Sequence, residues 1–203
     1  MALHPASLCL RPGQGTGLSG PNGSGKSTLL KLLAQILPAD SGEIYWDEKP
    51  VLGDRSFLRS TLGYVPQEDA LLEDLTVGRQ LRLWMGLCGR SGPPDGVVTA
   101  LLGLEELMGR RIGRLSGGMR RRVSIAMALL QRPRCLLMDE AFSGLDETYR
   151  HRLTQWLLDF LKGGGCLLWC SHSPEELSRV CVQQLRMEGG HLFPASPAGA
   201  VQP

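Results

Sequence analysis

The sequence lacks several features that would place it in a membrane or outside the cell. Its apolar runs stay below the roughly 18–20 residues that a helix needs to cross a bilayer. Residues 1–6 show no basic stretch followed by an apolar one, so we expect no signal peptide. The net charge of +2 is small and indicates neither a nucleic acid nor an anionic membrane surface as the target. With 203 residues, of which 42% are hydrophobic, the chain is long enough for one domain with a sizeable core.

The sequence also lacks paired cysteines. Six cysteines lie at positions 9, 88, 135, 166, 170 and 181, and none of them forms a C-x-x-C motif. Several lie inside apolar runs, which is typical of buried, reduced thiols in a cytosolic protein. The grouping of Cys166, Cys170 and His172 is open to interpretation as a metal site, but the small apolar residues around it favour a buried strand.

What the sequence does contain is a phosphate-binding loop. Residues 20–27 read G-P-N-G-S-G-K-S and fit the pattern G-x-x-x-x-G-K-[ST], in which backbone N–H groups wrap a polyphosphate. Lys26 is expected to reach the β- and γ-phosphates, and the Ser27 hydroxyl to hold Mg²⁺. A strand at 16–19 and a helix at 26–37 are expected on either side, and the positive end of the helix dipole then points at the anion. The predicted phosphate-contacting residues are Gly20, Pro21, Asn22, Gly23, Ser24, Gly25, Lys26, Ser27 and Thr28.

The rest of the chain alternates between strand and helix patterns, with one helical section in the middle. Strands are predicted at residues 7–10, 43–46, 62–65, 135–138, 166–170 and 184–188. Helices are predicted at residues 76–87, 97–104, 117–130 and 147–160, with a short one from Pro174. We therefore predict an α/β fold, a P-loop NTPase core with a mostly parallel sheet formed by about residues 7–67 and 134–192. A helical subdomain of about residues 68–133 is inserted into this core, and the tail at 193–203, rich in Pro, Ala and Gly, is expected to be disordered.

Two acidic residues end the apolar run at 135–138. A buried parallel strand delivers its carboxyl end to the ligand crevice of an open α/β sheet. Asp139 is therefore expected to hold Mg²⁺ through water, and Glu140, one residue further, to polarise the attacking water as a general base. Two solvated acids at an ordinary strand end would be the alternative if the chain had no phosphate loop.

Residues 115–119, L-S-G-G-M, form a second predicted anion-binding helix end. Ser116 is expected to cap the helix that follows, and Gly117 and Gly118 leave its first N–H groups uncovered. One nucleotide does not need two such ends on one face, so we expect the second end to contact a nucleotide held by another subunit. The three arginines at 120–122 are interpreted as a solvated helix face rather than a nucleic-acid patch, and we expect no nucleic-acid partner.

With the L-S-G-G-M motif added to the phosphate loop and the acidic strand end, the chain resembles the ATP-binding cassette (ABC) ATPases over about residues 7–192. Met119 stands where glutamine is common in that family. The resemblance implies that Gln67 touches Mg²⁺ and the attacking water, that residues 143–146 form the D-loop of the dimer interface, and that His172 is the switch histidine that contacts the γ-phosphate. The implied catalytic residues are Glu140, His172 and Gln67, the implied metal ligands are Ser27, Gln67 and Asp139, and the implied cofactors are ATP and Mg²⁺.

Two stretches are similar to different subfamilies. Residues 68–85 and the arginines after the L-S-G-G-M motif resemble bacterial drug, antibiotic and sodium exporters, whereas Ala141-Phe142, in place of the usual Pro-Thr, is similar to the small haem-exporter ATPases. The resemblance implies a subunit that hydrolyses ATP to power export of a drug, an antibiotic or another small molecule. The alternatives are a haem-exporter-like subunit and a soluble ABC ATPase of DNA repair or the ribosome. A nucleotide kinase outside the family would not need the motif at 115–119.

The resemblance also implies partners. A transmembrane permease subunit supplies the translocation path, and two ATPase subunits, as a homodimer or a heterodimer, sandwich two ATP molecules at the cytoplasmic face of the cell membrane. Leu83, Trp84 and Leu87 lie at helical spacing. We expect some of them to offer apolar surface to a coupling helix of the permease and the others to be core.

The residues before Lys26 include no Phe, Tyr or Trp. ABC ATPases of this type place an aromatic residue upstream of the phosphate loop, where it stacks on adenine, and His4 is the only ring available here. The first strand of the usual antiparallel subdomain is missing as well. Either the start is truncated, or the chain holds nucleotide almost wholly by its phosphates. The sequence therefore predicts a shortened N-terminus, a reduced antiparallel β subdomain and, for the 203-residue form, poor discrimination between ATP and GTP. Base–aromatic stacking is worth about 1–3 kcal/mol, so nucleotide binding is expected to be roughly 5- to 150-fold weaker.

Overall fold

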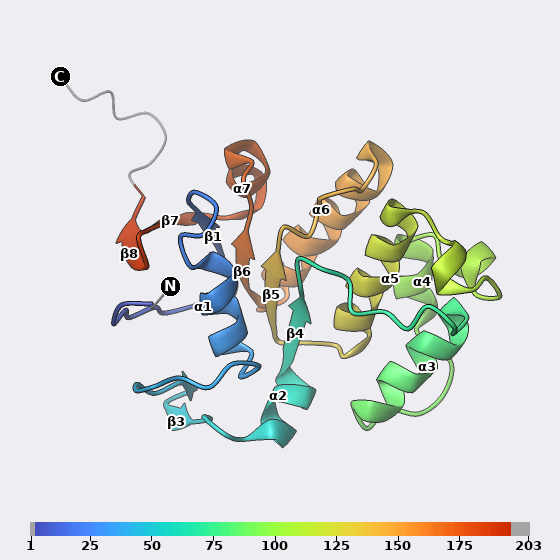
Figure 1. Cartoon of the computed structure of the whole chain (residues 1–203), viewed down its shortest axis with the longest axis horizontal. Coiled ribbons are helices and arrows are strands. Elements are labelled where there is room, and N and C mark those ends of the chain that lie inside the picture. Colours follow the sequence, from blue (N-terminus) through green and yellow to red (C-terminus); the bar gives the residue numbers. More distant parts are fainter. Residues whose placement is uncertain (1–2, 196–203) are drawn as a thin grey trace.

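A six-stranded sheet forms the centre of the computed structural model, which describes residues 3–195 (Figure 1). Its strand order is β4-β5-β6-β1-β7-β8. The first five of these pair in parallel, and β8 pairs antiparallel with β7. The strands are β1 (Gly15–Ser19), β4 (Leu62–Val65), β5 (Cys135–Asp139), β6 (Cys166–Cys170), β7 (Gln183–Glu188) and β8 (His191–Pro194). The predicted mostly parallel sheet is confirmed.

The two faces of the sheet belong to two apolar clusters. Successive side chains of a strand point to opposite faces. In β5, Cys135 and Leu137 join one cluster, whereas Leu136 and Met138 join the other. β6 alternates in the same way. Because both faces are buried, these strands read in the sequence as continuous apolar runs rather than as an alternation of apolar and polar residues.

Different helices cover the two faces. Helix α1 (Lys26–Leu33) packs on one face with Leu29 and Leu30 buried. The other face carries α5 (Gly117–Leu130), α6 (Glu147–Lys162) and α7 (Pro174–Val180). Helices α3 (Val77–Leu87) and α4 (Gly96–Leu101) join α5 in a helical region at one end of the molecule (Figure 1), together with the short 3₁₀ helices Glu105–Leu107 and Ile112–Arg114. The division into core and helical subdomain at the predicted boundaries stays a prediction.

A small antiparallel sheet and one unpredicted helix follow α1 along the chain. Strands β2 (Tyr45–Trp46) and β3 (Lys49–Pro50) pair as a hairpin, and α2 (Arg55–Thr61) comes next. The α2 helix begins at Asp54, whose carboxylate accepts the backbone N–H groups of Ser56 and Phe57. At seven residues it is too short to show a helical period in the sequence.

Three predicted boundaries are wrong. Residues 7–10 form no strand, since neither sheet in the described part of the chain includes them. Helix α1 ends at Leu33 rather than at residue 37, because Gln35 adopts a left-handed conformation with a φ of 52°. The predicted disordered tail overlaps β8, which contains Phe193, and Ala195 N–H donates to the Gln184 oxygen at 2.9 Å. The remainder of that tail, residues 196–203, lies outside the described residues.

The first described residues run beside the β7–β8 edge of the sheet (Figure 1). The His4 N–H donates to the Gly190 oxygen at 3.0 Å, and the His4 ring stacks on His191 with centroids 3.8 Å apart. Leu3, Leu8 and Leu10 pack against the apolar cluster of α1. The predicted weak, base-indifferent nucleotide binding concerns this edge and stays a prediction.

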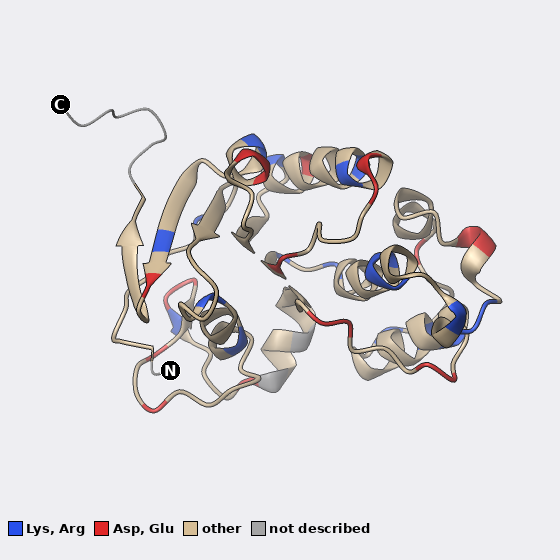
Figure 2. Cartoon of the chain, turned by 45° about the horizontal axis from the view of Figure 1, so that its top comes forward, with Lys and Arg blue, Asp and Glu red and all other residues tan. Residues whose placement is uncertain are grey.

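Acidic and basic residues are interspersed over the molecule, in keeping with the small net charge (Figure 2). Between residues 3 and 195, no helix combines the length and the apolarity that a bilayer crossing requires.

Candidate active site

Four parallel strands end at one edge of the sheet, and each is followed by a segment of the predicted site. The register pairs Leu18 of β1 and Asp139 of β5 with the same residue of β6, Cys170. Strand β4 ends at nearly the same height in the sheet, since its last residue, Val65, lies opposite Met138 of β5. The phosphate loop and the three predicted catalytic residues therefore leave the sheet together, at the carboxyl edge where open α/β sheets bind ligands.

The phosphate loop runs from the end of β1 to the start of α1. The Lys26 side chain is buried, and its ammonium donates to two carbonyl oxygens of the loop. The turn between β7 and β8 supports the loop from outside, where the Gly190 N–H donates to the Ser24 oxygen at 3.0 Å. Gly20 has a φ of 146°, and a Cβ at this position would overlap the Met187 carbonyl oxygen. The loop is therefore held both from within by Lys26 and from the neighbouring turn.

A cavity of about 250 Å³ lies over this loop and gathers most of the predicted site. Its walls contain every predicted catalytic and metal-binding residue and most of the phosphate loop. The lining residues are Asn22, Gly23, Ser24, Gly25, Lys26, Ser27, Thr28, Gln67, Asp139, Glu140 and His172. Gly20 and Pro21 are not among them; their carbonyl oxygens accept from Lys26 Nζ at 2.8 and 3.1 Å. The combination of an ammonium, loop N–H groups and carboxylates suits a polyphosphate bound with a cation.

Oxygen-bearing side chains from Ser27, Gln67 and Asp139 meet in this cavity. Asp139 is buried, and among the described residues its Oδ2 has no hydrogen-bond partner. A buried carboxylate oxygen is costly unless a donor or a cation compensates it. Hard oxygen ligands beside bound phosphates are the surroundings that Mg²⁺ prefers. The residues therefore fit the predicted Mg²⁺ site, and the assignment of the individual ligands stays a prediction.

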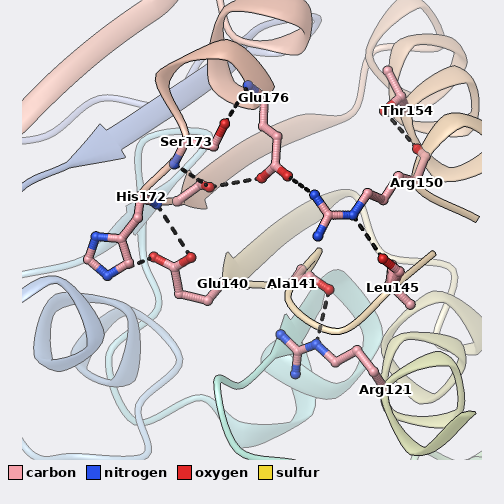
Figure 3. A network of polar contacts seen from close by, with 10 residues as sticks. Arg121, Glu140, Ala141, Leu145, Arg150, Thr154, His172, Ser173 and Glu176 are labelled. Carbon is pink, nitrogen blue, oxygen red and sulfur yellow. Dashed lines mark hydrogen bonds and ion pairs between the residues drawn. The ribbon is translucent and has the colours of Figure 1, made fainter. Parts of the chain in front are cut away.

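Glu140 follows β5 in an uncommon backbone conformation. Its φ is 48°, in the left-handed region that residues other than glycine rarely adopt. The Glu140 N–H donates to the Cys170 oxygen at 2.9 Å, and its carbonyl oxygen accepts the Ser143 N–H at 3.0 Å. The side chain is 15% exposed and faces His172, whose backbone N–H donates to Oε2 and whose Nε2 lies 3.4 Å from Oε1 (Figure 3). This arrangement brings the carboxylate and the imidazole together in the cavity.

Burial raises the pKa of the Glu140 carboxyl above its ordinary value of 4.5. The nearby His172 partly offsets this rise of the pKa, and the charge of Asp139 adds to it. A raised pKa makes a carboxylate a stronger proton acceptor, which suits a general base that works near neutral pH.

We expect Glu140→Gln to raise the free energy of unfolding of the nucleotide-free protein at neutral pH. Because the pKa of Glu140 is higher in the folded than in the unfolded state, the wild-type protein loses stability as the pH rises from 4.5 through the folded-state pKa. Glutamine stays neutral, so the difference in stability should shrink as the pH falls from about 8 to about 5. Urea unfolding of both proteins across this range measures it. A difference that does not change with pH would contradict the raised pKa.

A chain of polar contacts connects the segment that carries His172 to the start of α6 (Figure 3). The Ser171 hydroxyl donates to Glu176 Oε2 at 2.9 Å, and Arg150 Nη1 donates to Glu176 Oε1 at 2.6 Å. Arg150 Nε also donates to the Leu145 oxygen, in the predicted D-loop, at 2.9 Å. Sequence reasoning missed Arg150 and Glu176, since each reads as an ordinary polar residue of a helix.

The L-S-G-G-M motif starts α5, as predicted, but lies outside the cavity. Ser116 is the N-cap residue, and its Oγ accepts the Met119 N–H at 3.3 Å. Ser116 and Gly117 are exposed, whereas a Cβ at Gly118 would lie 2.6 Å from the Gly144 oxygen. The structure therefore does not bring these motif residues to the phosphate loop of the same chain. Their contact with a nucleotide stays a prediction.

Two of the three arginines after this motif are buried, so the interpretation of a solvated helix face is wrong for them. Arg121 and Arg122 are almost fully inaccessible, and Arg120 is partly exposed and pairs with Glu73 at 2.8 Å. The helical period contained the signal that could have revealed this. Arg121 stands four residues before the fully buried Ile125 and therefore lies on the same face of α5.

Comparisons with known proteins agree on one family. Residues 3–143 match the family described as ABC transporter. The Nod factor export ATP-binding protein I of Rhizobium etli is 35% identical over 188 residues, which are 91% of this chain and 60% of that protein. The probable multidrug ABC transporter ATP-binding protein YbhF of Escherichia coli K12 is 35% identical over 208 residues, covering 99% of this chain and 36% of that protein. This chain thus spans less than two thirds of the length of either relative.

Solved structures with the same architecture confirm the predicted fold class, an α/β P-loop NTPase core with added helices. A structure described as the ATP binding subunit of an ABC transporter has a TM-score of 0.86 at 24% identity, covering 95% of this chain and 83% of that chain. A dimeric structure of MJ0796, a bacterial ABC transporter cassette, has a TM-score of 0.80 at 22% identity, covering 94% of this chain and 89% of that one.

Proposed function

The chain belongs to the ATP-binding cassette (ABC) transporter family, and from this premise we propose that it is the ATP-binding and ATP-hydrolysing subunit of a membrane exporter. The observation that carries the proposal is the cavity in which the phosphate loop meets Glu140 and His172. The names of two relatives, a Nod factor exporter and a probable multidrug transporter, support export as the direction and a drug, an antibiotic or another small molecule as the cargo.

Hydrolysis depends in this proposal on a water held between Glu140 and the γ-phosphate. Lys26 turns from the loop carbonyls to the β- and γ-phosphates, and the loop N–H groups bind the remaining phosphate oxygens. Glu140 accepts a proton from the water while the water oxygen attacks the γ-phosphorus. The bond between that phosphorus and the bridging oxygen breaks, and the oxygen leaves with ADP. His172, 3.4 Å from Glu140, contacts the γ-phosphate. General-base assistance of this kind contributes about 10²- to 10⁴-fold to the rate.

Ser27, Gln67 and Asp139 are the proposed ligands of Mg²⁺, directly or through water. The unpartnered Oδ2 of buried Asp139 supports this assignment. When bound, the ion neutralises charge that develops on the β- and γ-phosphate oxygens.

The working unit in this proposal is a dimer of ATPase subunits, either two copies or one copy with a related subunit. Each ATP lies between the phosphate loop of one subunit and the Ser116 helix end of the other. Two features of the chain support it: the helix end at Ser116 is exposed, and Gly117 leaves the first N–H groups of α5 uncovered. Such uncovered N–H groups at a helix start attract anions.

The permease is proposed to dock at the groove between the sheet and the helical region, at the cytoplasmic face of the cell membrane. This apolar groove has a volume of about 590 Å³, is lined by residues of α1, β4, α3 and α5, and reaches Gln67. Leu83 and Leu87 of α3 are exposed. Trp84 packs instead against the apolar core and donates its Nε1–H to the Met127 oxygen at 2.7 Å. Of the three predicted docking residues, Trp84 lines the groove and also belongs to the fold. Leu83 and Leu87 do not line the groove but are accessible to a partner on the same helix, α3.

We expect Leu83→Glu combined with Leu87→Glu to uncouple transport from ATP hydrolysis. Two carboxylates on an apolar docking face weaken its contact with the permease, while the cavity remains intact. Transport and phosphate release are measured together in the transporter reconstituted with its permease. Val97→Glu is the control, because Val97 is also exposed but lies on α4, a helix that does not line the groove. Normal transport with the double variant would place the docking face elsewhere.

The aromatic residue after Ala141 does not by itself favour a haem exporter. Phe142 is buried and packs on Trp169 with ring centroids 4.5 Å apart, so core packing accounts for its size. A soluble ABC ATPase of DNA repair or the ribosome is the remaining alternative. It predicts the same ATP hydrolysis but no effect of the α3 variants on any transport.

ATP turnover by the purified chain tests the proposed function directly. We expect Mg²⁺-dependent release of phosphate from ATP, and its loss in Lys26→Ala, because no other residue of the loop supplies a cation to the β- and γ-phosphates. Lys162→Ala removes an exposed ammonium far from the loop and serves as the control. Equal phosphate release by wild type and Lys26→Ala would overturn the proposal.

A further inference from the structure

We propose that Arg121 positions the general base Glu140, by holding the backbone on both sides of that residue and joining it to the segment that carries Gln67. The inference rests on the proposed function, because it concerns how Glu140 is held for hydrolysis. Among the described residues, the side chains of Arg120 and Arg122 bond to neither the residues next to Glu140 nor the Gln67 segment.

The first part of the contact lies at the end of β5, on the residues before and after Glu140. Arg121 projects from α5, and only 4% of its side chain is exposed. Its Nη2 donates to the Asp139 oxygen at 2.8 Å. Its Nε donates to the Ala141 oxygen at 3.0 Å, the contact drawn in Figure 3. One guanidinium therefore bonds to the carbonyl oxygens of the residue before Glu140 and of the residue after it.

These two contacts add to the bonds of the Glu140 backbone with Cys170 and Ser143 and hold the chain on both sides of a strained residue. Glu140 has a φ of 48°, a conformation that a glutamate does not keep without support from its surroundings. With the carbonyl groups on either side fixed, the Glu140 side chain points into the cavity beside His172. Rotation of the Asp139–Glu140 peptide group would redirect the carboxylate, and the bond to the Ala141 oxygen holds the chain one peptide group beyond Glu140.

The second part of the contact lies on the segment after β4. Arg121 Nη1 donates to the Pro66 oxygen at 2.5 Å and to Asp69 Oδ1 at 3.0 Å, with the Gln67 oxygen 3.4 Å away. Asp69 supplies the only negative charge that the structure places against this guanidinium within the described residues. The same side chain thus connects α5, the Gln67 segment and Glu140, so a shift of the helical region reaches the general base through one residue.

Arginine is specifically suited to this position. Its planar guanidinium carries donors on three nitrogen atoms in a fixed fork, whereas the lysine ammonium is a single donor atom on a flexible stem. Lysine would retain the charge and much of the length of Arg121, but it would not reach both carbonyls and the Gln67 segment together.

The two neighbouring arginines provide matched controls. Arg122 is also buried and donates to backbone oxygens, at 3.0 Å to Leu102 and 3.3 Å to Gly103, and it lies over the Tyr149 ring. It lies outside the cavity and touches neither Glu140 nor Gln67. The Arg120 side chain pairs with Glu73 at the surface. Lysine substitutions at 120, 121 and 122 therefore distinguish two effects. Loss of a buried guanidinium affects the 121 and 122 variants, whereas loss of the contacts around Glu140 affects the 121 variant alone.

The test measures kcat for ATP hydrolysis, the Kd for MgATP and the unfolding midpoint in all three lysine variants. We expect Arg121→Lys to lower kcat roughly 10- to 100-fold, the cost of a small misplacement of a catalytic group, with a nearly unchanged Kd. Arg122→Lys should lower the unfolding midpoint as much or more while kcat stays close to wild type, and Arg120→Lys should change neither quantity. Equal kcat values for the 121 and 122 variants would overturn the proposal.

A double-mutant cycle with Glu140→Gln then distinguishes positioning from a general structural effect. If Arg121 acts through Glu140, Arg121→Lys should not lower the residual single-turnover rate of Glu140→Gln further. A further loss by the same factor as in the wild-type background would overturn the proposal. Should Arg121→Lys not fold, Asp69→Asn replaces it in the same cycle, and the same two outcomes decide. A wild-type chain that does not hydrolyse ATP, or a Glu140→Gln variant as fast as wild type, would contradict the proposed function itself.

Discussion

Glu140→Gln is expected to lower kcat for ATP hydrolysis by about 10²- to 10⁴-fold, because it removes the proton acceptor of the attacking water. The amide keeps the size of the side chain and its backbone contacts, so MgATP binding should persist. The variant should therefore accumulate as an ATP-bound dimer. Phosphate release, together with size-exclusion chromatography in the presence and absence of ATP, measures both effects.

The exposed glutamate Glu106 provides the control, since Glu106→Gln makes the same chemical change on the far side of the helical region. It should hydrolyse ATP at the wild-type rate. Near-normal turnover by Glu140→Gln would remove Glu140 from the role of general base. Such a result would not contradict the assignment of the fold or of the phosphate loop.

Ser116→Arg is expected to abolish ATP-driven dimer formation and hydrolysis while the monomer still binds nucleotide. Ser116 is exposed at the start of α5 and lies outside the cavity, so a large side chain there obstructs a second subunit rather than the chain's own phosphate loop. Calorimetry with ATP and size-exclusion chromatography report the two properties separately. Loss of nucleotide binding by the monomer would mean that the motif acts within one chain.

Two further variants sharpen this test. Ser116→Ala removes the N-cap oxygen without adding bulk, which costs about 0.5–2 kcal/mol of helix stability. It should dimerise far better than Ser116→Arg. A mixture of Ser116→Arg with Lys26→Ala should regain activity at no more than one of the two composite sites, because each heterodimer contains one intact pair of phosphate loop and helix end.

The ends of two strands were predictable because the site segments at Asp139 and His172 each follow an apolar run closely. Cys135–Asp139 and Cys166–Cys170 could be recognised as buried strands from their composition, and parallel pairing then brings their ends together. The motif order therefore sufficed to predict that Lys26, Glu140 and His172 share one cavity. The extra helix at Arg55–Thr61 could not be found in this way, since a short run capped by Asp54 has no period to detect.

The arginines show a different limit. Three identical residues in a row do not differ in type, so residue type alone does not indicate which two of them are buried, and their charge favours the surface for all three. Only their phase relative to Ile125 separates them, and the partners of Arg121 lie far away in sequence, near Pro66 and Asp139. Because every residue has a backbone oxygen, a contact with one cannot be predicted from the residue type of the partner. A positioning role of this kind becomes visible only once the chain is folded.

The place of β1 between β6 and β7 has a consequence for synthesis of the protein. The strand that leads into the phosphate loop emerges first, yet its two neighbours in the sheet begin at Cys166 and Gln183. The turn at Gly190, which braces Ser24, comes later still. A nascent chain therefore carries the complete G-x-x-x-x-G-K-S sequence long before the loop has the support that shapes it. Pairing over so great a separation along the chain is slow, so competence to bind nucleotide should arise late, when nearly all of the described chain has left the exit tunnel.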